Sequence, residues 1–233
     1  MIAWVLVAPR LRIARFLAGT ALSGFAGKSR GVLLPYPRDI EEHVRDFVYG
    51  IIEWRRLLEK VKRAGMSYVR SWAWIEEPLL GKLRLLHELG AGFDVRCYGP
   101  STMELFQLTG EILKLVFRVR VTGKVDLESW RRILKTEIKI PLREGYVTFS
   151  SVQPKIHGVE VIDVWKYPIP PTEKLSLETL SQDTVKNYVS YMFDYIIESK
   201  NVDEAYLKWL NDKGMEVPEN LKKLAKLLVL KDI

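Results

Sequence analysis

Residues 76–117 constrain the fold more than any other stretch, because they read as a helix, a strand and a second helix. Gly90 ends the first helix, since glycine adopts the left-handed conformation at a helix C-terminus without steric cost. Residues 93–98 read as a strand, and a capping box that begins at Ser101 opens a helix over residues 102–117. This order is typical of α/β proteins. The first helix takes its apolar face from leucines at three- and four-residue steps: Leu79, Leu80, Leu83, Leu86 and Leu89.

The rest of the first two thirds of the chain continues this alternation. Asp39 is expected to cap a long helix over residues 39–62, and Asp126 a shorter one to residue 134. Together the segments predict an α/β domain with a mostly parallel sheet flanked by helices. Strands are predicted at residues 2–7, 31–34, 66–74 and 159–165, and a hairpin at residues 137–140 and 146–152.

A stiff connector with prolines at 168, 170 and 171 is the best candidate for a domain boundary. We therefore predict a basic α/β domain at residues 1–168 and a helical appendage at residues 171–233. The appendage is expected to hold three amphipathic helices: one over residues 182–199, one capped by Asp203 and one opened by Pro218.

The charge of the chain is uneven. Its formal net charge is +7, although residues 171–233 hold nine lysines against eleven acidic residues. Residues 1–170 therefore carry 27 basic against 18 acidic residues. A basic body attracts nucleic acid or anionic ligands. The alternative is the solvated surface of a thermophilic protein, which the abundance of Lys, Arg and Glu over Asn and Gln also indicates.

Cysteine usage and hydropathy predict a cytoplasmic protein without a membrane segment. Cys97 is the single cysteine, which excludes a disulfide within the chain and favours a reducing compartment. The apolar residues 2–7 precede Arg10, the inverse of the order in a signal peptide. The apolar run 16–26 is too short to span a bilayer. Because no cysteines and histidines have the spacing of a zinc site, neither a metal nor a cofactor is assigned.

Polar side chains follow three predicted strands, at the edge of the sheet where α/β proteins bind ligands. Tyr36 and Tyr98 are two of them, and Glu76 with Glu77 forms the third group. Glu76 or Glu77 would act as a general base if it were buried beside a substrate. The alternative role for both is that of first-turn acids, which the helix dipole favours.

Two histidines complete the candidate catalytic set. His43 lies one turn into a helix that starts at a strand end, so it is expected to face the same edge. His157 lies on a loop before an apolar strand, where catalytic groups often occur. Cys97, inside a predicted strand, is expected to be a small buried hydrophobe and not a nucleophile.

The layout of residues 32–42, a short strand followed by Pro-Tyr-Pro and a capped helix, resembles the erythromycin esterase-like and TraB-like superfamily. Residues 89–98 extend this resemblance over the first half of the chain. It implies an α/β fold and, as in some members, hydrolysis by Glu and His at strand ends. The glycine-and-histidine signature of that superfamily has no counterpart after the first strand, so the site residues that the resemblance implies are His157 and a glutamate, Glu76 or Glu77.

A nuclease is a second enzymatic alternative. Asp126 followed by Glu137 and Lys139 resembles the acid-then-ExK arrangement of restriction-endonuclease-like nucleases. There the acids hold Mg²⁺ and the lysine orients the attacking water. The competing interpretation makes Asp126 a helix cap and leaves Glu137 in solvent.

The preferred function is a non-enzymatic accessory protein that contacts nucleic acid or a nucleoprotein assembly, and the alternative is an active or degenerate hydrolase. Residues 171–233 are expected to dock a protein partner. The predicted nucleic-acid contact is a basic stripe along the long helix that begins at Asp39: Arg55, Arg56, Lys60 and Arg63. Glu53 and Glu59 would weaken the positive field of this stripe if they paired with its cations.

Overall fold

The computed structural model describes residues 3–135, 140–154 and 158–229, which form two compact units. The described parts of these units do not follow the predicted boundary, because residues 108–135 group with the C-terminal segment. The sheet unit holds residues 3–10, 14–107, 140–154 and 158–166, and the helical unit holds residues 11–13, 108–135 and 167–229.

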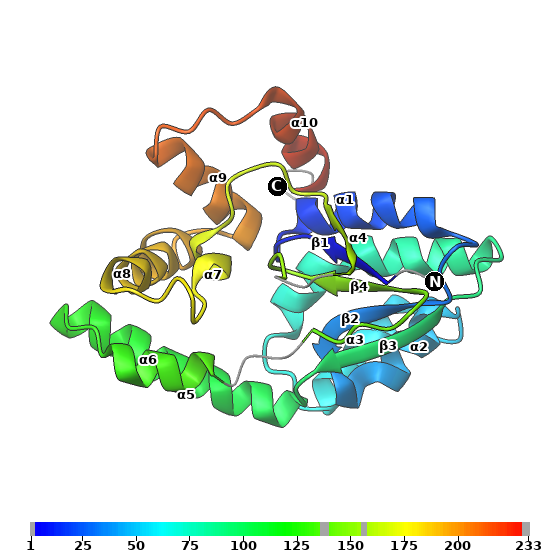
Figure 1. Ribbon diagram of the computed structural model, residues 1–233, viewed down its shortest axis with the longest axis horizontal. Coiled ribbons are helices and arrows are strands. Elements are labelled where there is room, and N and C mark those ends of the chain that lie inside the picture. The colour runs from blue at the N-terminus through cyan, green and yellow to red at the C-terminus, as the bar shows by residue number, and fades with distance from the viewer. Residues whose placement is uncertain (1–2, 136–139, 155–157, 230–233) are drawn as a thin grey trace. The chain divides into compact units, whose positions relative to one another are not determined.

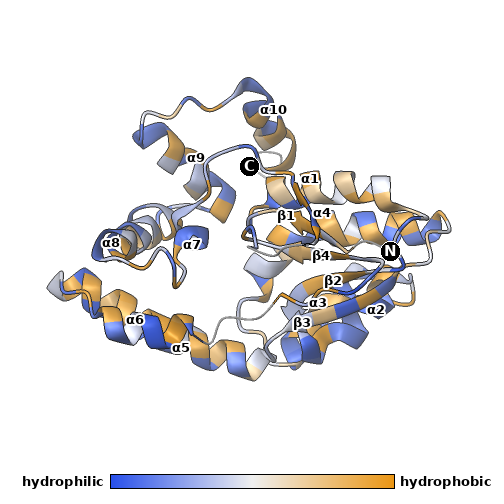
Figure 2. Ribbon diagram, in the orientation of Figure 1, coloured by the Kyte–Doolittle hydropathy of each residue, from blue (hydrophilic) through white to orange (hydrophobic). Residues whose placement is uncertain are grey.

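Five parallel strands form the sheet, in the order β3-β2-β4-β1-β5 (Figure 1). The fold class is therefore α/β, as predicted, and the sheet of the described residues is parallel throughout. Parallel strands are covered on both faces, which explains why β1 and β4 are apolar and almost entirely buried (Figure 2). The strands are β1 Trp4–Val7, β2 Gly31–Pro37, β3 Asp94–Gly99, β4 Tyr146–Ser150 and β5 Glu160–Asp163.

The predicted hairpin is wrong. Residues 137–139 lie outside the described residues, but β4 pairs with β1 on one edge and with β2 on the other. Both edges of β4 are therefore occupied by strands that are distant in sequence. The strand predicted at residues 146–152 does form, as β4, whereas its partner strands depend on chain crossovers that the local sequence does not show.

The predicted strand over residues 66–74 is also wrong, because α4 spans Val69–Glu88. Its buried residues recur at helical spacing and include Trp72, Glu76 and Leu83. The aromatic composition that suggested a strand serves helix packing instead, since Trp72 lies edge-to-face with Tyr36, with 5.5 Å between ring centroids. Pro78 lies inside α4.

The long helix predicted over residues 39–62 is broken. It consists of the 3₁₀ turn η2 Arg38–Ile40, then α2 Glu41–Val48 and α3 Trp54–Arg63. Gly50 lies in the break between α2 and α3 and has a φ of +74°, a conformation that glycine adopts without strain. Ile51 lies in this break and is 68% exposed.

The capping box predicted at Ser101 is confirmed. In α5 Thr102–Thr122 the Glu104 carboxylate accepts a hydrogen bond from the Ser101 N–H at 2.7 Å, and Ser101 Oγ accepts one from the Glu104 N–H at 3.3 Å. Asp39 does not cap its own helix; its carboxylate accepts from the Thr102 N–H at 3.0 Å. The helix α6 Leu127–Leu134 follows, and Asp126 caps it as predicted.

The helical unit contains the three C-terminal helices that were predicted. Its core joins α5, α6 and α8 through Val116, Val119, Trp130, Val185 and Val189. The C-terminal elements are the short α7 Pro171–Lys174, α8 Gln182–Ser190 with its π-helical continuation η3 Tyr191–Ile196, α9 Val202–Asp212 and α10 Glu219–Leu228.

Asp203 caps a different helix from the one predicted. Asn201 caps α9, since its side chain accepts from the Glu204 N–H at 2.9 Å. The Asp203 carboxylate is fully buried and accepts from the N–H groups of Arg12 at 3.0 Å and Ile13 at 3.1 Å. It thus satisfies the first N–H groups of α1 Arg12–Leu22, which have no partner within their own helix.

Asp203→Ala is expected to lower the free energy of unfolding by about 2–3 kcal/mol, because two buried N–H groups lose their acceptor. Asp203→Asn, which keeps one acceptor oxygen, should cost less. Chemical denaturation monitored by circular dichroism measures both, with the exposed Glu216→Ala as control. Equal stability of Asp203→Ala and wild type would contradict the capping role.

Candidate functional site

The carboxyl edge of the sheet is the first candidate site. Along the chain, the connections from β1 to β2 and from β2 to β3 lead towards one edge of the sheet. The connections from β3 to β4 and from β4 to β5 lead in the opposite direction. In open α/β sheets ligands bind where this direction reverses, which here is between β2 and β4. Tyr36 and Tyr98 lie on this edge as predicted, near the ends of β2 and β3.

A buried ion pair occupies this edge. Arg15 Nε lies 3.0 Å from one oxygen of Glu76 and 3.2 Å from the other, and the Tyr36 hydroxyl donates to the carboxylate at 2.7 Å. All three residues are at most 4% exposed. Arg15 Nη1 also donates to the carbonyl of Ala8, directly after β1, at 3.1 Å.

This geometry makes the Glu76 cluster (Arg15, Tyr36 and Glu76) a structural centre. Both carboxylate oxygens of Glu76 already accept hydrogen bonds inside the protein. The prediction that Glu76 starts a helix at a strand end is wrong, because it lies in the middle of α4. Sequence reasoning missed Arg15, although an arginine on the apolar face of a helix signals a buried partner.

The other hydrolase candidates are not joined to Glu76. His43 lies on α2 half-buried, and its Nδ1 is buried without a hydrogen-bond partner in the described structure. Glu77 is exposed on α4, outside the first turn in which it was predicted. His157 lies outside the described residues. The hydrolase hypothesis therefore keeps no assembled pair of catalytic groups within the part of the chain that is described.

The cysteine of β3 has the surroundings of a core residue. Cys97 is buried, and burial raises the pKa of its thiol far above the ordinary value. A thiol that stays protonated is a poor nucleophile.

The predicted basic stripe lies on α3 and is partly neutralised. Arg56 pairs with Glu59 at 2.9 Å and Arg55 lies 3.8 Å from the same carboxylate. Lys60 pairs with Asp46 of α2 at 3.3 Å. Arg63 is exposed in the last turn of α3, where the helix dipole stabilises a cation.

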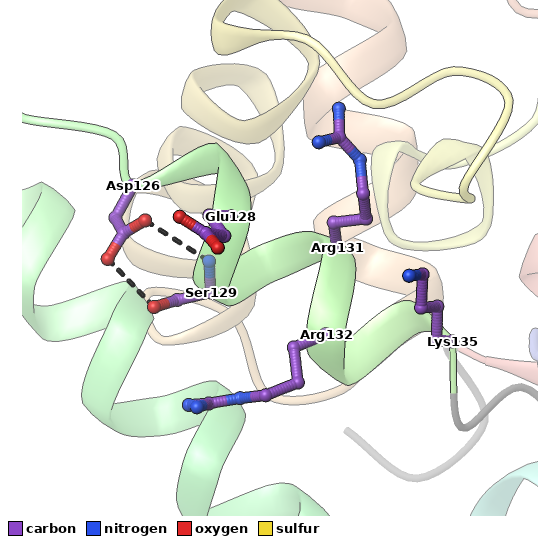
Figure 3. Close-up of a pocket in the computed structure, with 6 residues that line it drawn as sticks. All are labelled: Asp126, Glu128, Ser129, Arg131, Arg132 and Lys135. Atoms are coloured by element: carbon purple, nitrogen blue, oxygen red, sulfur yellow. Dashed lines mark hydrogen bonds between the residues drawn. The ribbon is translucent and has the colours of Figure 1, made fainter.

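A second basic surface, which sequence reasoning missed, lies on α6 around a hollow of about 520 Å³. Arg131, Arg132 and Lys135 line it and are exposed (Figure 3). Their spacing places them on the face opposite Trp130 and Ile133, the buried residues of α6. That pattern was the available signal. We call these three residues the α6 cations.

Asp126 lines the same hollow and is engaged as a cap. Its carboxylate accepts from the Ser129 N–H at 3.1 Å and from Ser129 Oγ at 2.7 Å, and it lies 3.5 Å from Arg118. The bonds from Ser129, followed by Arg118, lower the pKa of Asp126. The nuclease residues Glu137 and Lys139 lie outside the described residues, which contain no group of three or more potential metal ligands.

Glu76→Ala is expected to lower the free energy of unfolding by about 3–5 kcal/mol, because the Arg15 charge would stay buried without its carboxylate. The neighbouring Glu77→Ala, on an exposed position, should cost at most about 1 kcal/mol. Denaturant titration of the two variants makes the comparison. Similar losses in both would contradict the central role of the Glu76 cluster.

Stability is expected to fall above pH 10 through buried tyrosines. Burial and then Glu76 raise the pKa of Tyr36, and burial raises the pKa of Tyr98 to about 12. A raised pKa means that the stabilising contribution is complete below the unfolded value of about 10 and is lost as the pH rises through the folded value. Tyrosinate absorbance of the native protein should therefore lag that of the unfolded protein between pH 10 and 12. Superimposable titration curves would contradict this.

Comparison with known proteins adds no relative to this description. No family model, no curated protein and no solved structure matches the chain. The superfamily resemblance of residues 32–42 and 89–98 stays a prediction, and the function has to be argued from the geometry above.

Proposed function

We propose that the protein is a nucleic-acid-binding accessory protein and that the α6 cations contact phosphates. One observation carries this proposal. Arg131, Arg132 and Lys135 are exposed on one helix face, and the side chain of none of them has a hydrogen bond or ion pair with the described residues. Cations without a local carboxylate partner leave a positive field that attracts polyanions.

The hollow beside the α6 cations suits phosphate. Arginine offers a planar fork of donors that matches phosphate oxygens, and lysine adds a mobile point charge. Two carboxylates share the hollow, Asp126 and Glu128. The carboxylate of Asp126 is bound by Ser129 and Arg118. Among the described residues that line the hollow, Glu128 is therefore the one acid that is left to balance the charge of the three α6 cations.

The stripe on α3 is retained as a second contact of the same kind. Arg55 has a side chain that is 94% exposed, and Arg63 is exposed one turn beyond the pair of Lys60 with Asp46. Because Glu59 and Asp46 oppose it locally, we expect α3 to contribute less than α6. Docking of a protein partner by residues 171–233 stays a prediction.

Reversing the α6 cations (Arg131→Glu, Arg132→Glu and Lys135→Glu) is expected to weaken binding of duplex DNA or RNA at low salt by at least about tenfold. The slope of log affinity against log salt should become shallower by about 2–3, because a protein that makes fewer phosphate contacts releases fewer counterions when it binds. Fluorescence anisotropy at several salt concentrations measures both quantities.

The matched control changes the net charge equally at exposed lysines elsewhere: Lys186→Glu, Lys223→Glu and Lys226→Glu. This control is sharper than deletion of residues 171–233, which would remove Asp203 and the core residues Val185 and Val189. Equal losses in both triple variants would show that net charge alone acts. Absence of salt-sensitive binding by the wild-type protein would reject the proposal.

A further inference from the structure

An apolar stripe on α5 faces outward within the helical unit. Leu113, Phe117 and Val121 follow one another at four-residue steps and are 40%, 53% and 81% exposed. The core side of the same helix carries Val116 and Val119, both buried. The C-terminal part of α5 therefore has two apolar faces, of which one is used by the core of its own unit.

The stripe continues onto the π-helix η3. Phe193 lies edge-to-face with Phe117, with 5.5 Å between ring centroids, and the Arg120 guanidinium lies 5.0 Å from the centre of the Phe193 ring. Ile197, four residues after Phe193, is 60% exposed. Phe193 itself is half-buried and packs against the core of the helical unit. Exposed apolar side chains that lie together mark interaction surfaces. We call the exposed residues Leu113, Phe117, Val121 and Ile197 the α5 patch.

We infer that a second copy of this chain covers the α5 patch, with its α5 helix antiparallel to the first. The charges of α5 carry this choice of partner and direction. Its acidic residues, Glu104 and Glu111, precede its basic residues, Lys114, Arg118 and Arg120. A parallel pair would place like charges together, whereas an antiparallel pair places Glu111 of one copy near Arg118 of the other. The Arg118 side chain is 59% exposed and can serve this contact in addition to Asp126 of its own chain, which lies 3.5 Å away.

Two-fold symmetry fits the apolar residues as well. In an isologous interface the same patch is used by both copies, so Leu113 of one copy meets Phe117 of the other, and the reverse. Gly110, one turn before Leu113, permits close approach of a second helix, because a Cβ built there would meet nothing within 4 Å. Helix pairs pack most closely where small residues face the partner.

Sedimentation velocity over a range of protein concentrations tests the inference. The wild type is expected to dimerise, and Val121→Glu to raise the dimer dissociation constant by at least about 30-fold, since it places a charge in an apolar interface. Val121 is 81% exposed, so this variant should fold normally. The matched control Leu89→Glu, at a residue that is 75% exposed in the sheet unit, should leave the constant unchanged.

Cysteine cross-linking tests the direction of the pair. A mixture of Gly110→Cys and Val121→Cys proteins should form a disulfide-linked heterodimer under mild oxidation, and neither variant should cross-link alone. The native Cys97 is buried and contributes little background. Cross-linking of Gly110→Cys with itself would overturn the antiparallel arrangement. A wild-type protein that stays monomeric at high concentration, or a dimer insensitive to Val121→Glu, would overturn the inference as a whole.

Discussion

The buried pair of Arg15 and Glu76 is the interaction on which the sheet unit depends most. It places two opposite charges at the carboxyl edge of the sheet, where Tyr36 and the carbonyl of Ala8 complete their hydrogen bonds. Such a pair is stable only while every partner is present, because desolvation of an unpaired charge costs several kcal/mol. It therefore holds α1 and α4 in register with the ends of β1 and β2.

The same pair explains why the usual ligand edge of an α/β sheet is not our preferred site. Polar groups at that edge satisfy one another, and Tyr98 likewise donates to the carbonyl of Phe149 at 2.5 Å. The groups left with unused binding capacity lie elsewhere, on the outward face of α6 and on the exposed side of α5. Function is thus argued from charges and apolar surface that the fold does not consume.

Local signals predicted much of the secondary structure. The capping box at Ser101, the cap at Asp126 and the residue patterns of the strands β1 to β5 depend on residues within a few positions of each other, so they can be read directly. The α6 cations could also have been found, since they alternate with Trp130 and Ile133 at helical spacing. Prediction failed for residues 66–74, where aromatic residues suit a strand and a packed helix equally.

The sequence by itself determined that this chain forms an α/β fold with amphipathic helices, because the spacing of apolar residues and the capping of helices are local properties of the chain. Only the tertiary structure decided where the acidic side chains act. Asp39 caps α5, Asp203 caps α1, and Glu76 neutralises Arg15, each across 61 or more positions of the sequence. A carboxylate binds whichever donors folding brings within about 3 Å of it, and that choice belongs to the packed chain as a whole.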